Sequence, residues 1–129
     1  MALKDQFQSA DWKVEKHAPV VELLGEPRSG EGVDIRVSVG REIAHPNTTE
    51  HHIAWFDLYF RPDGEKYPVH LGRYEFAAHG AGLKGPNTGG VLGEPLVHLR
   101  VKFEKPGEIL ASSYCNIHGL WESSCRVDF

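Results

Sequence analysis

The sequence predicts an all-β fold, an antiparallel β-sandwich, and three observations lead to this prediction. Several segments alternate apolar and polar residues with a period of two, which is typical of half-buried strands. Fourteen glycines and eight prolines are spread over 129 residues, a composition that favours many turns. No stretch has the apolar spacing of an amphipathic helix of normal length.

Each expected strand has its own pattern. In residues 33–39 valine or isoleucine occupies every second position, and residues 97–103 alternate in the same way. Residues 52–60 are apolar on both faces apart from Asp57, as in a central strand. A Pro-Asp-Gly turn at 62–64 then returns the chain beside it. We expect strands at 18–24, 33–39, 52–60, 67–77, 97–103, 108–114 and 125–129. About seven short strands joined by Gly and Pro turns indicate an immunoglobulin-like sandwich.

Length and charge narrow the class of protein. A chain of 129 residues suits one core, so we expect a single domain over residues 1–129. The formal net charge of -4 gives no overall basic field for nucleic acid or an anionic membrane. No apolar run reaches the roughly 18 residues of a membrane span, and the polar N-terminus has no signal-peptide core. We therefore expect a cytoplasmic protein.

Histidine and cysteine are grouped in three short motifs. The chain has eight histidines and two cysteines, and imidazole and thiolate bind borderline transition metals well. Proline and asparagine in the second motif favour a tight turn that brings its histidines together. A Cys-x-x-His pair in the third can place both donors on one ion. The motifs contain Glu15, Lys16 and His17, then His45 and His51, then Cys115 and His118.

The donor set separates several kinds of metal site. A tetrahedral structural zinc needs four donors, and its usual signature contains two or more cysteines. A blue-copper site needs a weak axial ligand, usually methionine, and the only methionine here is Met1. Five donors with one nearby cysteine fit neither pattern well, but structural zinc stays an alternative.

Four longer motifs extend the pattern across the chain: EKHAPVVE, VGREIAHPNTTEHHI, GPNT and SYCNIHGLWE. In this order and at these separations they resemble the superoxide reductases of the one-iron class, the neelaredoxins, in the family of the desulfoferrodoxin iron-binding domain. The match runs from about Asp11 to Glu122. No cysteine precedes Cys115, so the four-cysteine iron site of the two-iron desulfoferrodoxins is not expected.

The resemblance implies an enzyme that detoxifies superoxide by one-electron reduction to hydrogen peroxide at one mononuclear non-haem iron. It implies that Glu15 closes an open sixth coordination position in resting Fe(III), and that Lys16 faces incoming superoxide. A rubredoxin-like donor would return Fe(III) to Fe(II), and family members are commonly homotetramers or dimers. The implied ligands are four equatorial histidines and one axial thiolate, namely His17, His45, His51, His118 and Cys115.

Two other functions stay open on these residues. The same iron could both oxidise and reduce superoxide, which would make the protein a dismutase. Alternatively, the chain could be a non-enzymatic immunoglobulin-like module whose histidine and cysteine cluster holds a structural metal such as zinc.

Residues beside the motifs receive mainly structural interpretations. His79 is expected to be structural rather than a ligand, and Trp121 to contribute apolar contact area. The backbone N–H groups of Asn116 and Ile117 are candidates to hydrogen-bond the sulfur of Cys115.

Overall fold

The structure, a computed structural model, describes all residues from 1 to 129 and consists of seven β-strands and one short 3-10 helix. The strands are short because glycine, proline and charged turns interrupt them. In chain order the elements are η1 (Leu3–Gln6), β1 (Val20–Leu23), β2 (Gly32–Ser38), β3 (Ile53–Pro62), β4 (Val69–Glu75), β5 (Leu96–Lys102), β6 (Gly107–Cys115) and β7 (Gly119–Val127).

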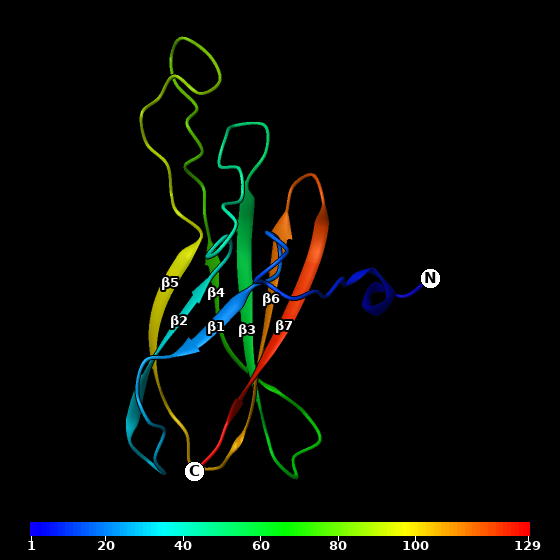
Figure 1. Cartoon of the computed structure of the whole chain (residues 1–129), viewed down its shortest axis with the longest axis vertical. Helices are drawn as coiled ribbons and strands as arrows, with labels where there is room; N and C mark the ends of the chain where they lie inside the picture. Colours follow the sequence, from blue (N-terminus) through cyan, green and yellow to red (C-terminus); the bar gives the residue numbers. More distant parts are fainter.

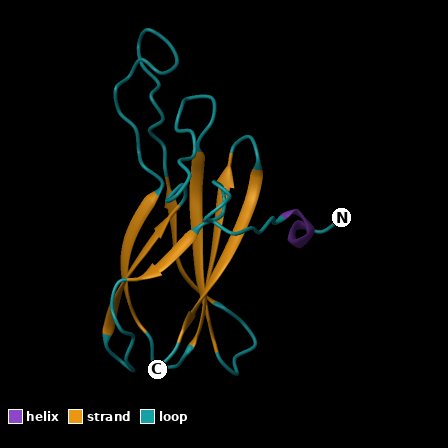
Figure 2. Ribbon diagram, viewed as in Figure 1, coloured by secondary structure: helices purple, strands orange, loops and turns teal.

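The strands form two antiparallel sheets that pack face to face (Figures 1 and 2). One sheet has the order β1-β2-β5, and the other has the order β4-β3-β6-β7. Every pairing is antiparallel. The predicted all-β sandwich of about seven strands is therefore confirmed, and β3 has the central position that its apolar sequence predicts.

Alternating side chains build one core between the sheets. In β2 the apolar positions Val33, Ile35 and Val37 are buried, whereas Asp34 between them is exposed. Thirteen buried residues form a single hydrophobic cluster. Their burial is the main favourable term for folding, at about 25 cal/mol per Å² of apolar surface.

Strand β6 places a cysteine at the end of this core. Its buried residues are every second one, from Gly107 through Ile109, Ala111 and Ser113 to Cys115. Because side chains of a strand alternate between faces, Cys115 must point into the sandwich like Ile109. The last strand differs from the prediction, since β7 begins at Gly119 and not near residue 125.

All three motifs meet at one end of the sandwich. The start of β1 pairs with the end of β2, and the start of β3 pairs with the end of β6. Antiparallel pairing therefore gathers the segments before β1, between β2 and β3, and between β6 and β7 at the upper end in Figure 1. The glycine-rich residues 80–90 lie in a long loop that extends beyond this end. No helix here is long and apolar enough to cross a membrane.

Candidate metal centre

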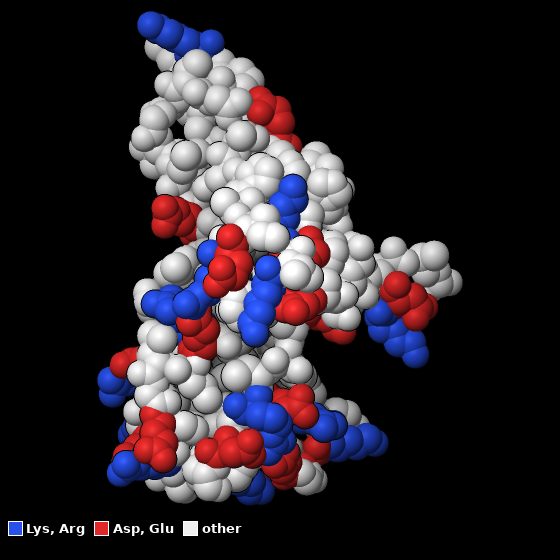
Figure 3. Space-filling view, viewed as in Figure 1, with Lys and Arg blue, Asp and Glu red and all other residues white.

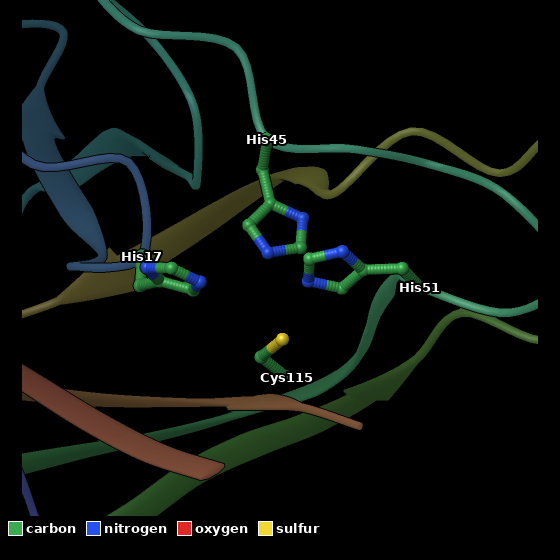
Figure 4. Close-up of side chains that lie close together, drawn as sticks. All are labelled: His17, His45, His51 and Cys115. Carbon is green, nitrogen blue, oxygen red and sulfur yellow. The ribbon is translucent and has the colours of Figure 1, made fainter. Parts of the chain in front are cut away.

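Four side chains from three separate segments converge at this end of the sandwich. One ligand atom from each of His17, His45, His51 and Cys115 lies within 4.8 Å of the other three. In Figure 4 the three imidazoles surround a central point, and the sulfur of Cys115 points toward it from the sheet. Neighbouring rings meet edge to face, with centroids 4.8 Å apart for His17–His45 and for His45–His51.

Cys115 is fully buried, and its thiol is not in a disulfide. Both cysteines are free, as the metal-site prediction requires. The sulfur accepts a hydrogen bond from the backbone N–H of His118 at 3.3 Å. The prediction for Asn116 was wrong, since its N–H donates to the carbonyl oxygen of His52 at 3.2 Å. A positive φ of 82° at Gly119 lets the chain reverse directly into β7.

Contacts with Ser113 and Glu15 fix the position of His17. Its side chain is buried, and Ser113, on the inner face of β6, donates its hydroxyl to the carbonyl oxygen of His17 at 3.2 Å. The carboxylate of Glu15 accepts from the His17 backbone N–H at 2.6 Å and lies 2.5 Å from its Nδ1. With Nδ1 engaged by the carboxylate, Nε2 is the ring nitrogen of His17 available to a metal at the centre.

The loop of residues 45–52 carries two of the histidines, and internal bonds fold it tightly. Thr48 accepts from the N–H of His51 through its hydroxyl at 3.0 Å, and its own N–H donates to the carbonyl oxygen of His51 at 2.9 Å. Nδ1 of His45 lies 2.7 Å from the carbonyl oxygen of Pro46. These contacts confirm the predicted turn and point both Nε2 atoms inward.

Burial keeps the two loop histidines uncharged at neutral pH. It lowers the pKa of His45 to about 4, and nearby histidines and Lys16 add smaller effects in the same direction. Burial likewise lowers the pKa of His51, again with a contribution from Lys16. Neutral imidazoles keep a lone pair on nitrogen, which metal binding requires.

The donors fit a transition-metal ion. The Nε2 atoms of His45 and His51 are buried and have no hydrogen-bond partner within the protein. A buried nitrogen without a partner costs free energy, and a metal ion at the centre would satisfy both atoms. Imidazole nitrogen with one thiolate is a donor set for borderline metals such as iron, and it lacks the carboxylates that Mg²⁺ or Ca²⁺ prefers.

His118, the fifth predicted ligand, lies at the rim of the cluster. Its Nδ1 is 3.1 Å from Nε2 of His17 and 3.8 Å from the sulfur of Cys115. Its ring centroid is 5.0 Å from that of His51. The residue is exposed, so the cluster reaches solvent on this side.

Glu15 and Lys16 flank the cluster, as their place in the sequence predicts. Burial raises the pKa of Glu15, but hydrogen bonds from the ring and N–H of His17 and from the N–H of Ala18 outweigh it and lower the pKa overall. Lys16 is half-buried, and its charge acts on both His45 and His51. An ionised carboxylate and an ammonium group therefore lie beside the cluster.

Trp121 also contacts the cluster, which the sequence analysis did not predict. Its indole stacks on the ring of His17, with centroids 5.0 Å apart and planes 12° from parallel. Its Nε1 donates to the carbonyl oxygen of His118 at 3.2 Å, and Gln8 donates to the same oxygen at 3.0 Å. Trp121 on β7 pairs with Ser113 on β6, so the two side chains share one face of the sheet, and this register cannot be read from the sequence.

Several known proteins match this chain over nearly their whole length. The family model for desulfoferrodoxin matches residues 9–124. Neelaredoxin of Megalodesulfovibrio gigas is 51% identical over 127 residues, which are 98% of each chain. Superoxide reductase of Pyrococcus furiosus is 49% identical over 126 residues, 98% of this chain and 99% of that protein.

A solved structure gives the same result for the fold. The reduced superoxide reductase (neelaredoxin) of Archaeoglobus fulgidus superposes with a TM-score of 0.90 at 55% identity, and the match covers 96% of this chain and 99% of the other. Sequence and fold agree over nearly the whole length. The chain therefore belongs to the desulfoferrodoxin family.

Proposed function

We propose that this chain is a superoxide reductase, an oxidoreductase that converts superoxide to hydrogen peroxide with one electron. The observation that carries the proposal is the convergence of three imidazoles and a buried cysteine sulfur within 4.8 Å. Relatives named superoxide reductase or neelaredoxin at about half identity over nearly their full length support it. The cofactor is one mononuclear non-haem iron per chain.

Five side chains are proposed to hold this iron, supported by the buried Nε2 atoms without partners and by the nearness of the fifth donor. One thiolate would balance part of the charge of Fe(II), and four neutral imidazoles would add no negative charge. The hydrogen bond from the backbone N–H of His118 to the sulfur of Cys115 would moderate the donor strength of this sulfur. The proposed ligands are His17, His45, His51, His118 and Cys115.

When bound, the iron supplies the single electron, and two protons complete the conversion of superoxide to hydrogen peroxide. The protein's own residues bind and orient the anion. Exposed His118 marks the proposed mouth of the site, through which a small solute and solvent protons would enter. Two free cysteines are typical of a reducing compartment, which supports the proposed cytoplasmic location.

Lys16 and Glu15 are proposed to act at this mouth. The ammonium group of Lys16 lies near two ligands in a protein of net charge -4, where it would attract an anion locally. On the face seen in Figure 3, acidic and basic side chains are mixed, so a local charge has more effect than a general field. Glu15 is hydrogen-bonded to His17 and would orient this ligand. By rotating away from His17, the carboxylate of Glu15 would reach the metal.

Further parts of the proposal concern partners and extent. An external donor such as rubredoxin must return one electron per cycle, because the reaction consumes it. A homo-oligomer, tetramer or dimer, is supported by the long loop that leaves Leu83, Val91 and Leu92 exposed. The single core cluster supports one domain over residues 1–129. A role in oxidative stress follows from the substrate.

A stoichiometric assay of the iron-loaded protein tests the function. Reduced protein would be mixed with superoxide while superoxide, hydrogen peroxide and oxygen are measured together, after metal quantification and an absorption spectrum before and after oxidation. We expect one hydrogen peroxide per superoxide, no oxygen, and matching consumption of the reductant. The oxidised protein should be coloured, because a ferric thiolate absorbs visible light.

Two other outcomes would contradict the proposal in distinct ways. Oxygen and peroxide in equal amounts without consumption of reductant would identify a dismutase. A colourless protein that contains zinc and leaves superoxide unchanged would identify a structural metal site.

A further inference from the structure

His79 is a buried histidine with no part in the chemistry proposed above. It lies at the start of the long loop of residues 77–95, and 8% of its surface is exposed. A buried polar ring needs partners, because burying it without hydrogen bonds costs free energy. Its partners lead toward the loop of residues 45–52, which carries His45 and His51.

Hydrogen bonds hold both edges of the His79 ring. Nδ1 lies 2.9 Å from Oδ1 of Asn47, and Nε2 lies 2.5 Å from the carbonyl oxygen of Phe76. Asn47 donates through Nδ2 to the carbonyl oxygen of Gly93 at 3.0 Å, which fixes its amide with the oxygen toward His79. A neutral ring donates one of the two bonds, and a protonated ring donates both. Asn47 follows His45 by two residues, so the contact acts close to a proposed ligand.

A ring stack connects His79 with the other end of the same loop. The rings of His79 and His52 lie 3.5 Å apart between centroids and 4° from parallel. His52 directly follows His51, and its Nδ1 is 2.9 Å from the carbonyl oxygen of Thr48. Its backbone N–H donates to the side chain of Asn116, the neighbour of Cys115, at 2.9 Å. The stack therefore supports His52, which connects the proposed ligand His51 with the neighbour of the proposed ligand Cys115.

The backbone of residue 79 adds a third attachment. The hydroxyl of Thr49 donates to the carbonyl oxygen of His79 at 2.8 Å. The N–H of Thr49 donates to Oδ1 of Asn87, which belongs to the same long loop, at 2.9 Å. Thus the middle and both ends of the loop 45–52 are fastened to the long loop, and His79 takes part in three of these contacts.

We infer that His79 is a positioning residue of the metal centre, which fixes the loop 45–52 through its hydrogen bond to Asn47. The inference deepens the proposed function and rests on it only in taking His45 and His51 as metal ligands. Two ligands on one loop bind tightly when the loop is already ordered, because binding then does not have to order it. His79 supplies this order without touching the metal.

Two substitutions separate positioning from filling of space. In His79→Phe the ring, the stack on His52 and most of the volume remain, but the bond to Asn47 is lost. In His79→Asn the side-chain amide can still donate near the former Nδ1 position, but the stack is lost and a cavity appears. If His79 only fills space, His79→Phe should retain more stability and more metal affinity than His79→Asn. If His79 is a positioning residue, His79→Asn should retain the higher metal affinity.

The measurements use the full chain, with Co²⁺ as the probe. Affinity is obtained by competition of the metal-free protein with a chelator, and the visible spectrum of bound Co²⁺ reports the ligand geometry. We expect His79→Phe to weaken Co²⁺ binding by about tenfold and to shift its spectrum. His79→Asn should stay within about threefold of the unsubstituted protein despite a lower unfolding temperature. The control His98→Phe changes an exposed histidine and should leave both properties unaltered.

Amide hydrogen exchange of the metal-free protein gives a second readout. The N–H groups of Thr48, Thr49, His51 and His52 are all hydrogen-bonded in the loop. They should exchange faster in His79→Phe than in His79→Asn. Equal exchange in both variants, or tighter Co²⁺ binding by the Phe variant, would overturn the inference.

If the two His79 variants do not fold, a variant of Asn47 tests the same hydrogen bond from its other partner. Asn47→Ala removes the acceptor and should reproduce the loss of affinity of His79→Phe, and unchanged affinity would contradict the inference. A protein that held zinc, or that dismutated superoxide, would give the same exchange results. Failure of the proposed function and failure of this inference are therefore distinguishable.

Discussion

At the level of single residues, each proposed ligand is held by a neighbour that contacts it directly. Cys115 receives the N–H of His118, and His17 lies between the carboxylate of Glu15 and the indole of Trp121. Such contacts orient a ligand and tune its basicity. Single substitutions can therefore separate the ligands from the residues around them.

Replacing the thiolate should abolish the chemistry while preserving the fold. Cys115→Ser substitutes a poorer and harder donor at a buried position, so we expect loss of the visible absorption of the oxidised iron protein and of superoxide reduction. Absorption spectroscopy and a superoxide assay check this. Cys125→Ser is the control, because that cysteine lies ten residues away on β7 and should keep colour and activity. A coloured, fully active serine variant at 115 would contradict the ligand assignment.

Removing the charge at the mouth should affect the approach of the anion. Lys16→Ala should slow the capture of superoxide by up to about tenfold and flatten its dependence on ionic strength. Pulse radiolysis at several salt concentrations measures both. Lys84→Ala removes an exposed charge from the long loop and should have no effect. If the Lys16 variant keeps the original salt dependence, the ammonium group does not steer the substrate.

At the level of elements, the turn after β2 decides where His45 lies. Gly40 has a positive φ of 85°, and a Cβ there would lie 2.8 Å from the backbone nitrogen of His45. The chain can return toward the cluster only because this position has no side chain. The connection between two sheets thus depends on one glycine.

Substitution of this glycine should disturb stability and the metal site together. Gly40→Ala should cost about 1–2 kcal/mol for the left-handed backbone, with more from the clash, and should weaken metal binding. Gly64→Ala is a matched control, because Gly64 has a φ of 81° but nothing within 4 Å of its Cβ position. It should lose a similar strain energy and keep its metal affinity. Urea unfolding and metal competition measure the two effects, and equal metal affinity in both variants would refute this prediction.

At the level of the whole molecule, the buried histidines couple stability to pH. Burial lowers the pKa of His45 from 6.5 to about 4, and it also lowers the pKa of His51 and of His79. Between these pH values the unfolded chain binds more protons than the folded chain, so stability falls as the pH falls. Four carboxylates also have a lowered pKa. Glu15, Glu22 and Glu50 add to this loss only below about pH 4.5, and Asp63 only below about pH 3.8.

The metal-free protein should therefore lose stability through this window. We expect its free energy of unfolding to decrease from about pH 6.5 to about pH 4 by at most about 1.4 kcal/mol per pH unit for each such histidine. Urea unfolding across this range gives the slope. His45→Gln should have a shallower slope, and an unchanged slope in that variant would show that His45 is not the titrating group.

Much of the fold was predictable because its signals are local. The alternation in residues 33–39 and 97–103 predicts strands that bury every second residue, such as Ile35, and β2 and β5 match these ranges to within one residue. The last strand was harder to predict, since the beginning of β7 around Trp121 lacks a clear alternation. The candidate site was predictable as a set of residue types, through motifs rich in histidine and cysteine.

Local sequence was enough to predict most strands, the turns and the residue types of the candidate site, because these depend on residues close together in the chain. Tertiary structure was needed to establish that His17 meets Cys115 across almost a hundred residues, that Trp121 stacks on His17, and that His79 contacts Asn47 in the loop 45–52. These contacts depend on strand register and on the packing of two sheets. Neither leaves a periodic signal in a single segment.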